Sequence, residues 1–325
     1  MRLIFMGSPG LVVPVLDALT RLENSQVVGV YTSPDRPRGR GRAEEMTPVK
    51  VYAVEHDLNV YQPATLRSAP TQTQLLALRP DVIVVAAYGR FLPALVLKMP
   101  PHGCLNLHPS LLPRYRGPSP VVTALAHGES VTGVTLMLLD EGMDTGPIIA
   151  QREYPISSAD TAESLTSALF KLGSALLVEK LNPWASGRLT SQPQDSALAT
   201  VTHKLERADG EANWQLPAPK LERLRRAYTP WPGLFTHWRG MVLKLLDVVA
   251  LPAGAGVTGE PGLVVALEDA NVPVAVATAE GWLGLKTLQL EGRKSVSAAE
   301  FLRGYPSFIG TRIGSTIGSH RRIHQ

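Results

Sequence analysis

The chain has 325 residues, 44% of them hydrophobic, a formal net charge of +4 and a single cysteine. This length exceeds what one hydrophobic core usually organises, so we expect two domains. The single cysteine excludes an intramolecular disulfide and a cysteine-rich zinc site, and no apolar run approaches the roughly 20 residues that a membrane-spanning helix needs. The whole positive excess lies in residues 183–325, which suits a polyanionic partner of that part.

Short apolar runs alternate with helical patterns through the N-terminal part. We predict strands at residues 2–6, 27–32, 82–87, 103–108 and 132–139, and helices at residues 12–22, 47–55, 67–78, 118–126 and 161–181. This alternation is typical of an α/β fold with a Rossmann-like, doubly wound parallel sheet. Because the first strand begins at Arg2, no room is left for a signal or transit peptide, and we expect a cytoplasmic protein.

The turn after the first predicted strand, Gly7-Ser8-Pro9-Gly10, occupies the place of a Rossmann phosphate-binding loop. It lacks the Gly-x-Gly-x-x-Gly spacing that lets a backbone approach a pyrophosphate. An NAD-dependent dehydrogenase is therefore disfavoured.

Residues 34–47 carry arginines that alternate with proline and glycine: Arg36, Arg38, Arg40 and Arg42. A segment of this kind cannot pack into a core, and its glycines favour mobility. Arginine makes bidentate contacts to phosphates and stacks on bases. We therefore predict a contact with nucleic acid, and a solvated flexible loop is the alternative.

The strand predicted at residues 82–87 is followed by a glycine and an apolar pair. Gly89 permits close approach of the backbone to a flat ligand, and Phe91 with Leu92 can line an apolar slot. The alternative is a simple strand-to-helix turn.

Residues 104–117 consist of a short apolar strand and a proline-rich loop. Strand alternation places Cys104, Asn106 and His108 on one face. Polar side chains at the carboxyl end of a strand in an α/β sheet lie where ligands usually bind. A hydrogen-bonded structural histidine is the alternative for His108, and we interpret Cys104 as a small apolar filler rather than a nucleophile.

Residues 133–147 form an apolar strand and then an acidic turn that carries Asp140, Glu141 and Asp144 between glycines. Glycine allows the backbone to fold tightly around the acids. Asn106, His108 and Asp144 together supply an amide donor, a proton carrier and an orienting carboxylate. Acyl transfer to an amine requires this set of groups, although Asp144 could also be a solvated turn residue.

The C-terminal part has a different pattern. We expect a catalytic domain at residues 1–182, a surface linker at residues 183–213 without sustained periodicity, and a second domain at residues 214–325. An amphipathic helix is predicted at residues 217–228. Short strands follow at residues 234–239, 241–249, 262–267, 272–277 and 282–290. They predict a small OB-like β-barrel, a class that often binds nucleic acid, and residues 310–325 are predicted to be a poorly ordered tail.

Two motifs closely resemble those of the folate-dependent formyltransferases. They are Asn106-Leu-His108-Pro-Ser110-Leu-Leu-Pro113 and Gly142-Met-Asp144-Thr-Gly146-Pro147. The likeness extends to residues 4–9, residues 34–41, Ala87-Tyr88-Gly89 and Pro230-Trp231-Pro232. It therefore covers nearly the whole chain.

This resemblance implies an activity and a set of site residues. The formyl group of 10-formyltetrahydrofolate would pass to the α-amino group of methionine on initiator tRNA, for translation initiation, without a metal ion and in a monomer. Asn106 and His108 would face the oxyanion, and Asp144 would orient the imidazole and accept the proton of the amine. Folate-binding residues would be Tyr88, Gly89, Phe91, Leu92, Ser110, Leu111, Leu112, Pro113 and Asp140. The tRNA would contact the second domain and Arg36, Arg38, Arg40, Arg42 and Lys204.

Two alternatives remain open. The same donor could serve an amino sugar nucleotide or glycinamide ribonucleotide, or the protein could bind RNA or folate without catalysis. The arginine-rich segment at residues 34–47 and the basic second domain favour tRNA.

Overall fold

The structure is a computed structural model that describes residues 1–38, 43–252 and 259–314. These residues form two compact units. The first unit comprises Met1–Val121, Ser130–Ser157 and Ser164–Lys204, and the second comprises Val122–Glu129, Ser158–Glu163 and the chain from Leu205 onward. In the described residues, none of the helices combines the length and apolar character needed to cross a membrane.

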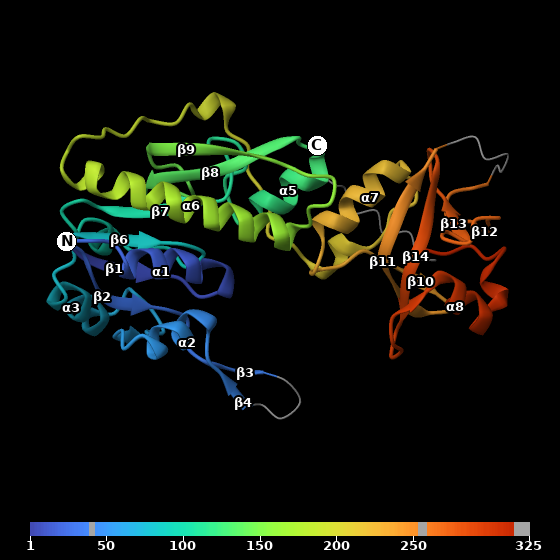
Figure 1. Ribbon diagram of the computed structural model, residues 1–325, viewed down its shortest axis with the longest axis horizontal. Coiled ribbons are helices and arrows are strands. Elements are labelled where there is room, and N and C mark those ends of the chain that lie inside the picture. Colours follow the sequence, from blue (N-terminus) through green and yellow to red (C-terminus); the bar gives the residue numbers. More distant parts are fainter. Residues whose placement is uncertain (39–42, 253–258, 315–325) are drawn as a thin grey trace. The chain divides into compact units, whose positions relative to one another are not determined.

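A seven-stranded sheet organises the first unit (Figure 1). Its order is β5-β2-β1-β6-β7-β8-β9, and the five strands from β5 to β7 run parallel. The strands are β1 (Arg2–Met6), β2 (Gln26–Tyr31), β5 (Val60–Tyr61), β6 (Val82–Val85), β7 (Cys104–His108), β8 (Val131–Leu138) and β9 (Ile148–Pro155). The strand order reverses between β1 and β6, so the sheet is doubly wound and the predicted Rossmann-like class is confirmed.

The strand predicted at residues 132–139 is β8, and it runs antiparallel to β7. Leu105 pairs with Leu138, and His108 pairs with Thr135. The chain therefore enters β8 from the edge at which β7 ends, without the crossover that a parallel pair requires. β9 extends the antiparallel part. It was missed because its second half, Gln-Arg-Glu-Tyr-Pro, is polar.

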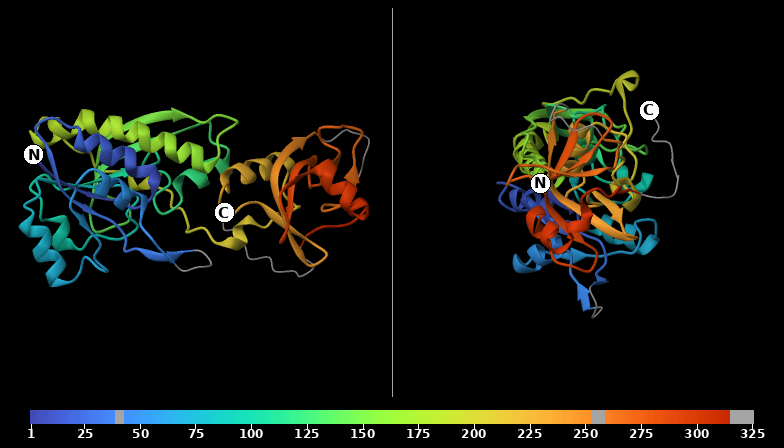
Figure 2. Two further views of the ribbon diagram at one scale, coloured as in Figure 1. Left: turned by 60° about the horizontal axis from the view of Figure 1, so that its bottom comes forward. Right: turned by 90° about the vertical axis from the view of Figure 1, so that its right-hand side faces the viewer.

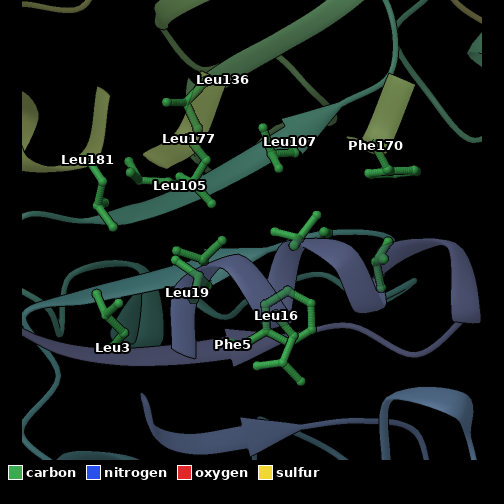
Figure 3. Close-up of a cluster of buried hydrophobic side chains, with 14 of the residues drawn as sticks. Leu3, Phe5, Leu16, Leu19, Leu105, Leu107, Leu136, Phe170, Leu177 and Leu181 are labelled. Atoms are coloured by element: carbon green, nitrogen blue, oxygen red, sulfur yellow. The ribbon is translucent and has the colours of Figure 1, made fainter. Parts of the chain in front are cut away.

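Helices cover both faces of this sheet. Against one face pack α1 (Val13–Thr20), α2 (Pro48–Glu55) and α6 (Ala162–Ala185), and against the other pack α3 (Ala69–Ala77) and α4 (Ala94–Leu97). Figures 1 and 2 show α1 and α6 side by side. In Figure 3, Leu105 and Leu107 of β7 point into the core with α6 residues such as Leu177. The alternate residues of β7 therefore face the side of α3 and α4.

A small hairpin interrupts the arginine-rich segment. β3 (Arg36–Arg38) pairs antiparallel with β4 (Ala43–Glu45). The alternative of a flexible loop is wrong for these two stretches, because proline is tolerated in an edge strand and did not exclude pairing here. Only the backbone is described for Arg36 and Arg38, and Arg40 and Arg42 lie outside the described residues.

The second unit contains a curled antiparallel sheet of order β10-β11-β14-β13-β12, with β15 beside β14. Its strands are β10 (Phe235–Trp238), β11 (Met241–Leu251), β12 (Val264–Ala266), β13 (Val274–Ala277), β14 (Trp282–Leu290) and β15 (Val296–Ser297). In the described residues, three α-helices also belong to this unit, wholly or mainly: α5 (Pro120–His127), α7 (Ala218–Ala227) and α8 (Ala298–Gly304). In the described residues β10 and β12 are not paired, so the predicted OB-like domain is a half-barrel.

The last described residues pack against this half-barrel. Ile313 is buried and donates its N–H to Gly262, and Val264 donates to Thr311. The predicted poorly ordered tail is therefore wrong for residues 310–314, where one buried isoleucine outweighs the Gly/Ser-rich composition. Residues 315–325 lie outside the described residues.

Candidate active site

Strand β7 presents Asn106 and His108 on the sheet face opposite to Leu105 and Leu107. The Asn106 side chain is half-buried, whereas His108 is only 4% exposed. In the part of the chain that the structure describes, the amide of Asn106 has no hydrogen-bond partner. It is therefore available to a ligand.

Both ring nitrogens of His108 face acceptors. Nε2 lies 2.9 Å from the backbone oxygen of Tyr115, and Nδ1 lies 3.5 Å from Oδ2 of Asp144. A carbonyl oxygen can only accept, so Nε2 carries a proton. The carboxylate of Asp144 faces the other ring nitrogen and is an acceptor for a proton on Nδ1.

Asp144 lies in the loop of residues 139–147, which we call the acidic loop. Its Oδ2 accepts the N–H of Gly117 at 2.8 Å as well as facing His108. The backbone of Asp144 is left-handed, with φ of 56°. A non-glycine residue held there costs on the order of 1 kcal/mol and persists only where its surroundings fix it.

The residue that donates to Asp144 is a glycine for a steric reason. Gly117 has φ of 106°, and a Cβ atom there would lie 2.9 Å from the backbone oxygen of Thr202. A side chain would therefore push the donor away from Asp144.

Cys104 shares the face of Asn106 but is fully buried, with its thiol near the backbone oxygen of Val96. Burial raises the pKa of this thiol to about 12. Because the thiolate is the nucleophilic form, Cys104 is a packing residue.

The predicted folate-binding residues on the loop after β7, which we call the exit loop (residues 109–119), are mostly internal. Ser110 and Leu112 are buried, and the Ser110 hydroxyl donates to the backbone oxygen of Arg114. Thr135 of β8 donates to Ser110 and accepts from the N–H of Leu112. Pro113 follows a cis peptide bond. These residues set the shape of the exit loop.

Leu111 is half-buried and lies against Gly133 of β8, where a Cβ atom would approach it to 2.5 Å. Asp140 accepts from the N–H of Gly142 and the hydroxyl of Thr145. It therefore closes the turn of the acidic loop.

The segment after β6 contains both buried residues and residues that a ligand can reach. Tyr88 and Leu92 belong to the hydrophobic cluster on the α3 and α4 face, and burial raises the pKa of Tyr88. Phe91 is 67% exposed, and Gly89 has open space where a side chain would lie. Phe91 and Gly89 are therefore the members of this segment that an incoming ligand can reach.

A second polar segment, residues 192–203, also lies at the site although its sequence did not predict this; we call it the linker segment. Arg116 of the exit loop donates its N–H to Thr200 and accepts from the N–H of Thr202. Gln194 contacts both the acidic loop and Arg116. The alternation of threonine at residues 200 and 202 was the one available signal for this pairing.

The predicted tRNA-binding residues are only partly described. Lys204 is exposed and, in the described part of the chain, forms no ion pair. Among the described residues, no group of three His, Cys, Asp or Glu side chains is placed to hold a metal ion.

The family comparisons match both units. The description "Formyl transferase" matches residues 1–181, and "Formyl transferase, C-terminal domain" matches residues 204–306. A protein of Roseiflexus sp. (strain RS-1) named methionyl-tRNA formyltransferase is 47% identical, over 97% of this chain and 95% of its own length. One of the same name from Chloroflexus aggregans is also 47% identical, over 94% of this chain and 97% of its own length.

A solved structure has the same fold. The N-formyltransferase from Helicobacter canadensis, in complex with folinic acid and dTDP-3-aminofucose, superposes with a TM-score of 0.63 at 17% identity. The match covers 90% of this chain and 99% of that one. Together with the family matches and the close relatives, this places the chain in the formyl transferase family.

Proposed function

We propose that this protein transfers the formyl group of 10-formyltetrahydrofolate to the α-amino group of methionine on initiator Met-tRNA. The relatives named methionyl-tRNA formyltransferase support the acceptor, because they match nearly the full chain at 47% identity. The observation that carries the chemistry is the placement of Asn106, His108 and Asp144 around one face of β7. The folinic acid in the Helicobacter structure supports a formyl folate as donor.

In this mechanism the neutral amine attacks the formyl carbon, and N10 of the folate leaves. The tetrahedral intermediate needs a donor for its oxyanion, an acceptor for the proton of the amine and a proton for N10. Direct attack by an amine needs neither a metal ion nor a covalent enzyme intermediate.

We assign the direct hydrogen bond to the oxyanion to Asn106, whose amide has no partner among the described residues. Sequence analysis gave His108 the same donor role. Because both its ring nitrogens already face Tyr115 and Asp144, His108 acts instead through its positive charge beside the oxyanion.

Asp144 holds the imidazolium and accepts the proton of the amine, directly or through water. The same proton then passes from Asp144 to N10 as the bond between N10 and the formyl carbon breaks. The Oδ2 atom of Asp144 is occupied by Gly117 and His108, whereas Oδ1 has no partner in the described part of the chain. This second oxygen is the acceptor that the mechanism requires.

The pterin ring would lie between the acidic loop and the segment of residues 88–92. Open space at Gly89 and the exposed ring of Phe91 support this position, because a flat heterocycle needs an accessible backbone and an apolar surface. Tyr88, Leu92 and Leu112 would then support the slot from the core, and Asp140 would hold its rim.

The tRNA would contact the exposed Lys204 and the arginines of residues 36–42, together with the C-terminal domain. We propose a cytoplasmic monomer with a catalytic domain at residues 1–182, a linker at residues 183–213 and a tRNA-binding domain at residues 214–325. The match of the C-terminal family description to residues 204–306 supports this division.

The test is formyl transfer from 10-formyltetrahydrofolate to charged initiator Met-tRNA, beside charged elongator Met-tRNA, free methionine and glycinamide ribonucleotide. Transfer to the initiator alone is the expected result. Transfer only to a small amine would replace the acceptor, and binding of folate or RNA without any transfer would reject catalysis.

A further inference from the structure

One side chain of the linker segment contacts both loops that surround His108. Nε2 of Gln194 donates to the backbone oxygens of Asp144 at 2.8 Å and Gly146 at 2.7 Å. Its Oε1 accepts from Nε and Nη2 of Arg116 at 3.0 and 2.8 Å. A half-buried amide fifty residues from Asp144 in sequence is thus joined to the acidic loop and the exit loop at once.

The orientation of this amide follows from its partners. Two carbonyl oxygens can only accept, so the NH₂ group must face them, and the guanidinium can only donate, so the oxygen must face Arg116. A flipped amide would lose all four hydrogen bonds. Gln194 therefore has a single allowed position.

The position of Arg116 is set by contacts other than the one with Gln194. Arg116 is 8% exposed, and its backbone is paired with Thr200 and Thr202 of the linker segment. In the described residues its guanidinium has no carboxylate partner, so the oxygen of Gln194 is the acceptor that compensates a buried cation. The position of Gln194 is therefore dictated by the exit loop.

The acidic loop depends on these contacts because Asp144 has a left-handed backbone. The carbonyls that Gln194 binds belong to Asp144 and Gly146, so one NH₂ group fixes the backbone that directly follows the strained Cα atom of Asp144. The other side of Asp144, its carboxylate, is held by Gly117. The contact with the carboxylate thus comes from the exit loop, and the contacts with the carbonyls come from the linker segment.

We propose that Gln194 is a positioning residue that sets Asp144 against His108, and that the linker segment acts on catalysis through this one side chain. This inference rests on the proposed function for its rate measurements. A misplacement of about 1 Å in a reacting group can cost roughly 10²-fold in rate. Gln194 contributes through this geometry and touches no reacting atom.

The first variant is Gln194→Met, which keeps the length of the side chain and removes its hydrogen bonds. The matched control is Gln192→Met, because Gln192 is an exposed glutamine whose backbone alone pairs with Ile148. We expect kcat to fall between about tenfold and 100-fold in Gln194→Met, with KM for folate and Met-tRNA within about twofold of wild type. Gln192→Met should match wild type.

The second variant, Gln194→Glu, separates positioning from stability. A carboxylate keeps the acceptor for Arg116 as an ion pair but places negative charge against the carbonyls of Asp144 and Gly146. We expect Gln194→Glu to have a higher Tm than Gln194→Met and at least as large a loss of kcat. A residue that only stabilised the fold would show activity that follows Tm.

Hydrogen exchange supplies a readout independent of turnover. Amides of the acidic loop should exchange faster in Gln194→Met than in Gln192→Met, because the loop loses two hydrogen bonds. Equal exchange, or wild-type kcat in folded Gln194→Met, would overturn the proposal. If wild-type protein formylates no Met-tRNA, the proposed function fails, and faster exchange would still establish the positioning of the loop.

Discussion

The exit loop and the linker segment are paired in space but differ in how their sequences indicate a function. The exit loop follows a buried strand that ends in His108, and it carries three prolines and two arginines. The linker segment contains two glutamines, two alanines and two threonines and shows no sustained periodicity. Yet the backbone of Arg116 is bonded on both sides to Thr200 and Thr202.

This difference reflects two kinds of functional residue: those that take part in the reaction, and those that hold the reacting residues in place. Reacting groups are recognisable by type, because an amide, an imidazole and a carboxylate have distinct chemistry. Positioning groups act through hydrogen bonds to backbone atoms, which many polar side chains could make. The reacting groups of β7 and the acidic loop, together with these two segments, therefore offer a graded set of tests that ends at the exposed face of the linker segment.

The largest effects are expected at the reacting groups. Asn106→Ala, His108→Ala and Asp144→Ala should each lower kcat by roughly 10² to 10³, the usual cost of removing a preorganised group at an oxyanion. Single-turnover formyl transfer measures the chemical step directly. The control is Glu153→Gln on β9, because Glu153 is exposed and its carboxylate has no hydrogen-bond partner among the described residues. Near-full activity in any of the three variants removes that residue from the mechanism.

The next effect is expected where the two segments touch most closely. Gly117→Ala combines a left-handed backbone with a Cβ atom 2.9 Å from Thr202, and we expect a loss of roughly 1–3 kcal/mol in the free energy of unfolding. The donor to Asp144 would also move, so kcat should fall.

Gly187→Ala is the matched control for this variant. Its φ is 72°, and no atom lies within 4 Å of the added Cβ. Gly187→Ala has only the cost of placing alanine in a left-handed backbone. The difference in unfolding free energy between the two variants, measured by urea titration, therefore reports the contact with Thr202. Equal losses in stability and unchanged kcat in both would mean that the close approach has no role.

A smaller effect is expected from a single hydroxyl of the linker segment. Thr202 is 5% exposed, accepts the N–H of Ser119 and donates to the backbone oxygen of Arg116. Thr202→Val keeps the shape of the side chain and removes both of these hydroxyl hydrogen bonds, at a cost of about 1–3 kcal/mol in unfolding free energy. Thr190→Val, at an exposed position outside the linker segment, should be neutral in the same urea titration.

Much of the first unit could be predicted because its signals are local. The apolar residues of β7 predicted a strand, and their alternation with polar residues predicted that Asn106 and His108 share one face of it. Asp144 was predicted as a site residue because it lies in an acidic turn between glycines. The hydrogen bond between Asp144 and Gly117 could not be predicted, because it depends on how two loops meet after the sheet forms.

The missed elements share a physical cause. β5 has two residues, and β9 alternates with charged side chains, so neither shows a strong apolar pattern. Gln194 has an even weaker signal, since its partners are backbone oxygens fifty residues earlier. Local propensity contains no information on such contacts, and only the assembled sheet brings them together.

The smallest effect is expected at Val201, on the face of the linker segment that points away from the exit loop. Val201 lies between two threonines whose hydroxyls bond to the exit loop, and period-two alternation turns its side chain outward. It is 70% exposed although its backbone bridges to Arg116. Val201→Ser should therefore change the unfolding free energy by no more than about 0.5 kcal/mol and leave kcat unchanged. A loss as large as that of Thr202→Val in the same titration would show that the linker segment is held by burial of its side chains rather than by hydrogen bonds on one face.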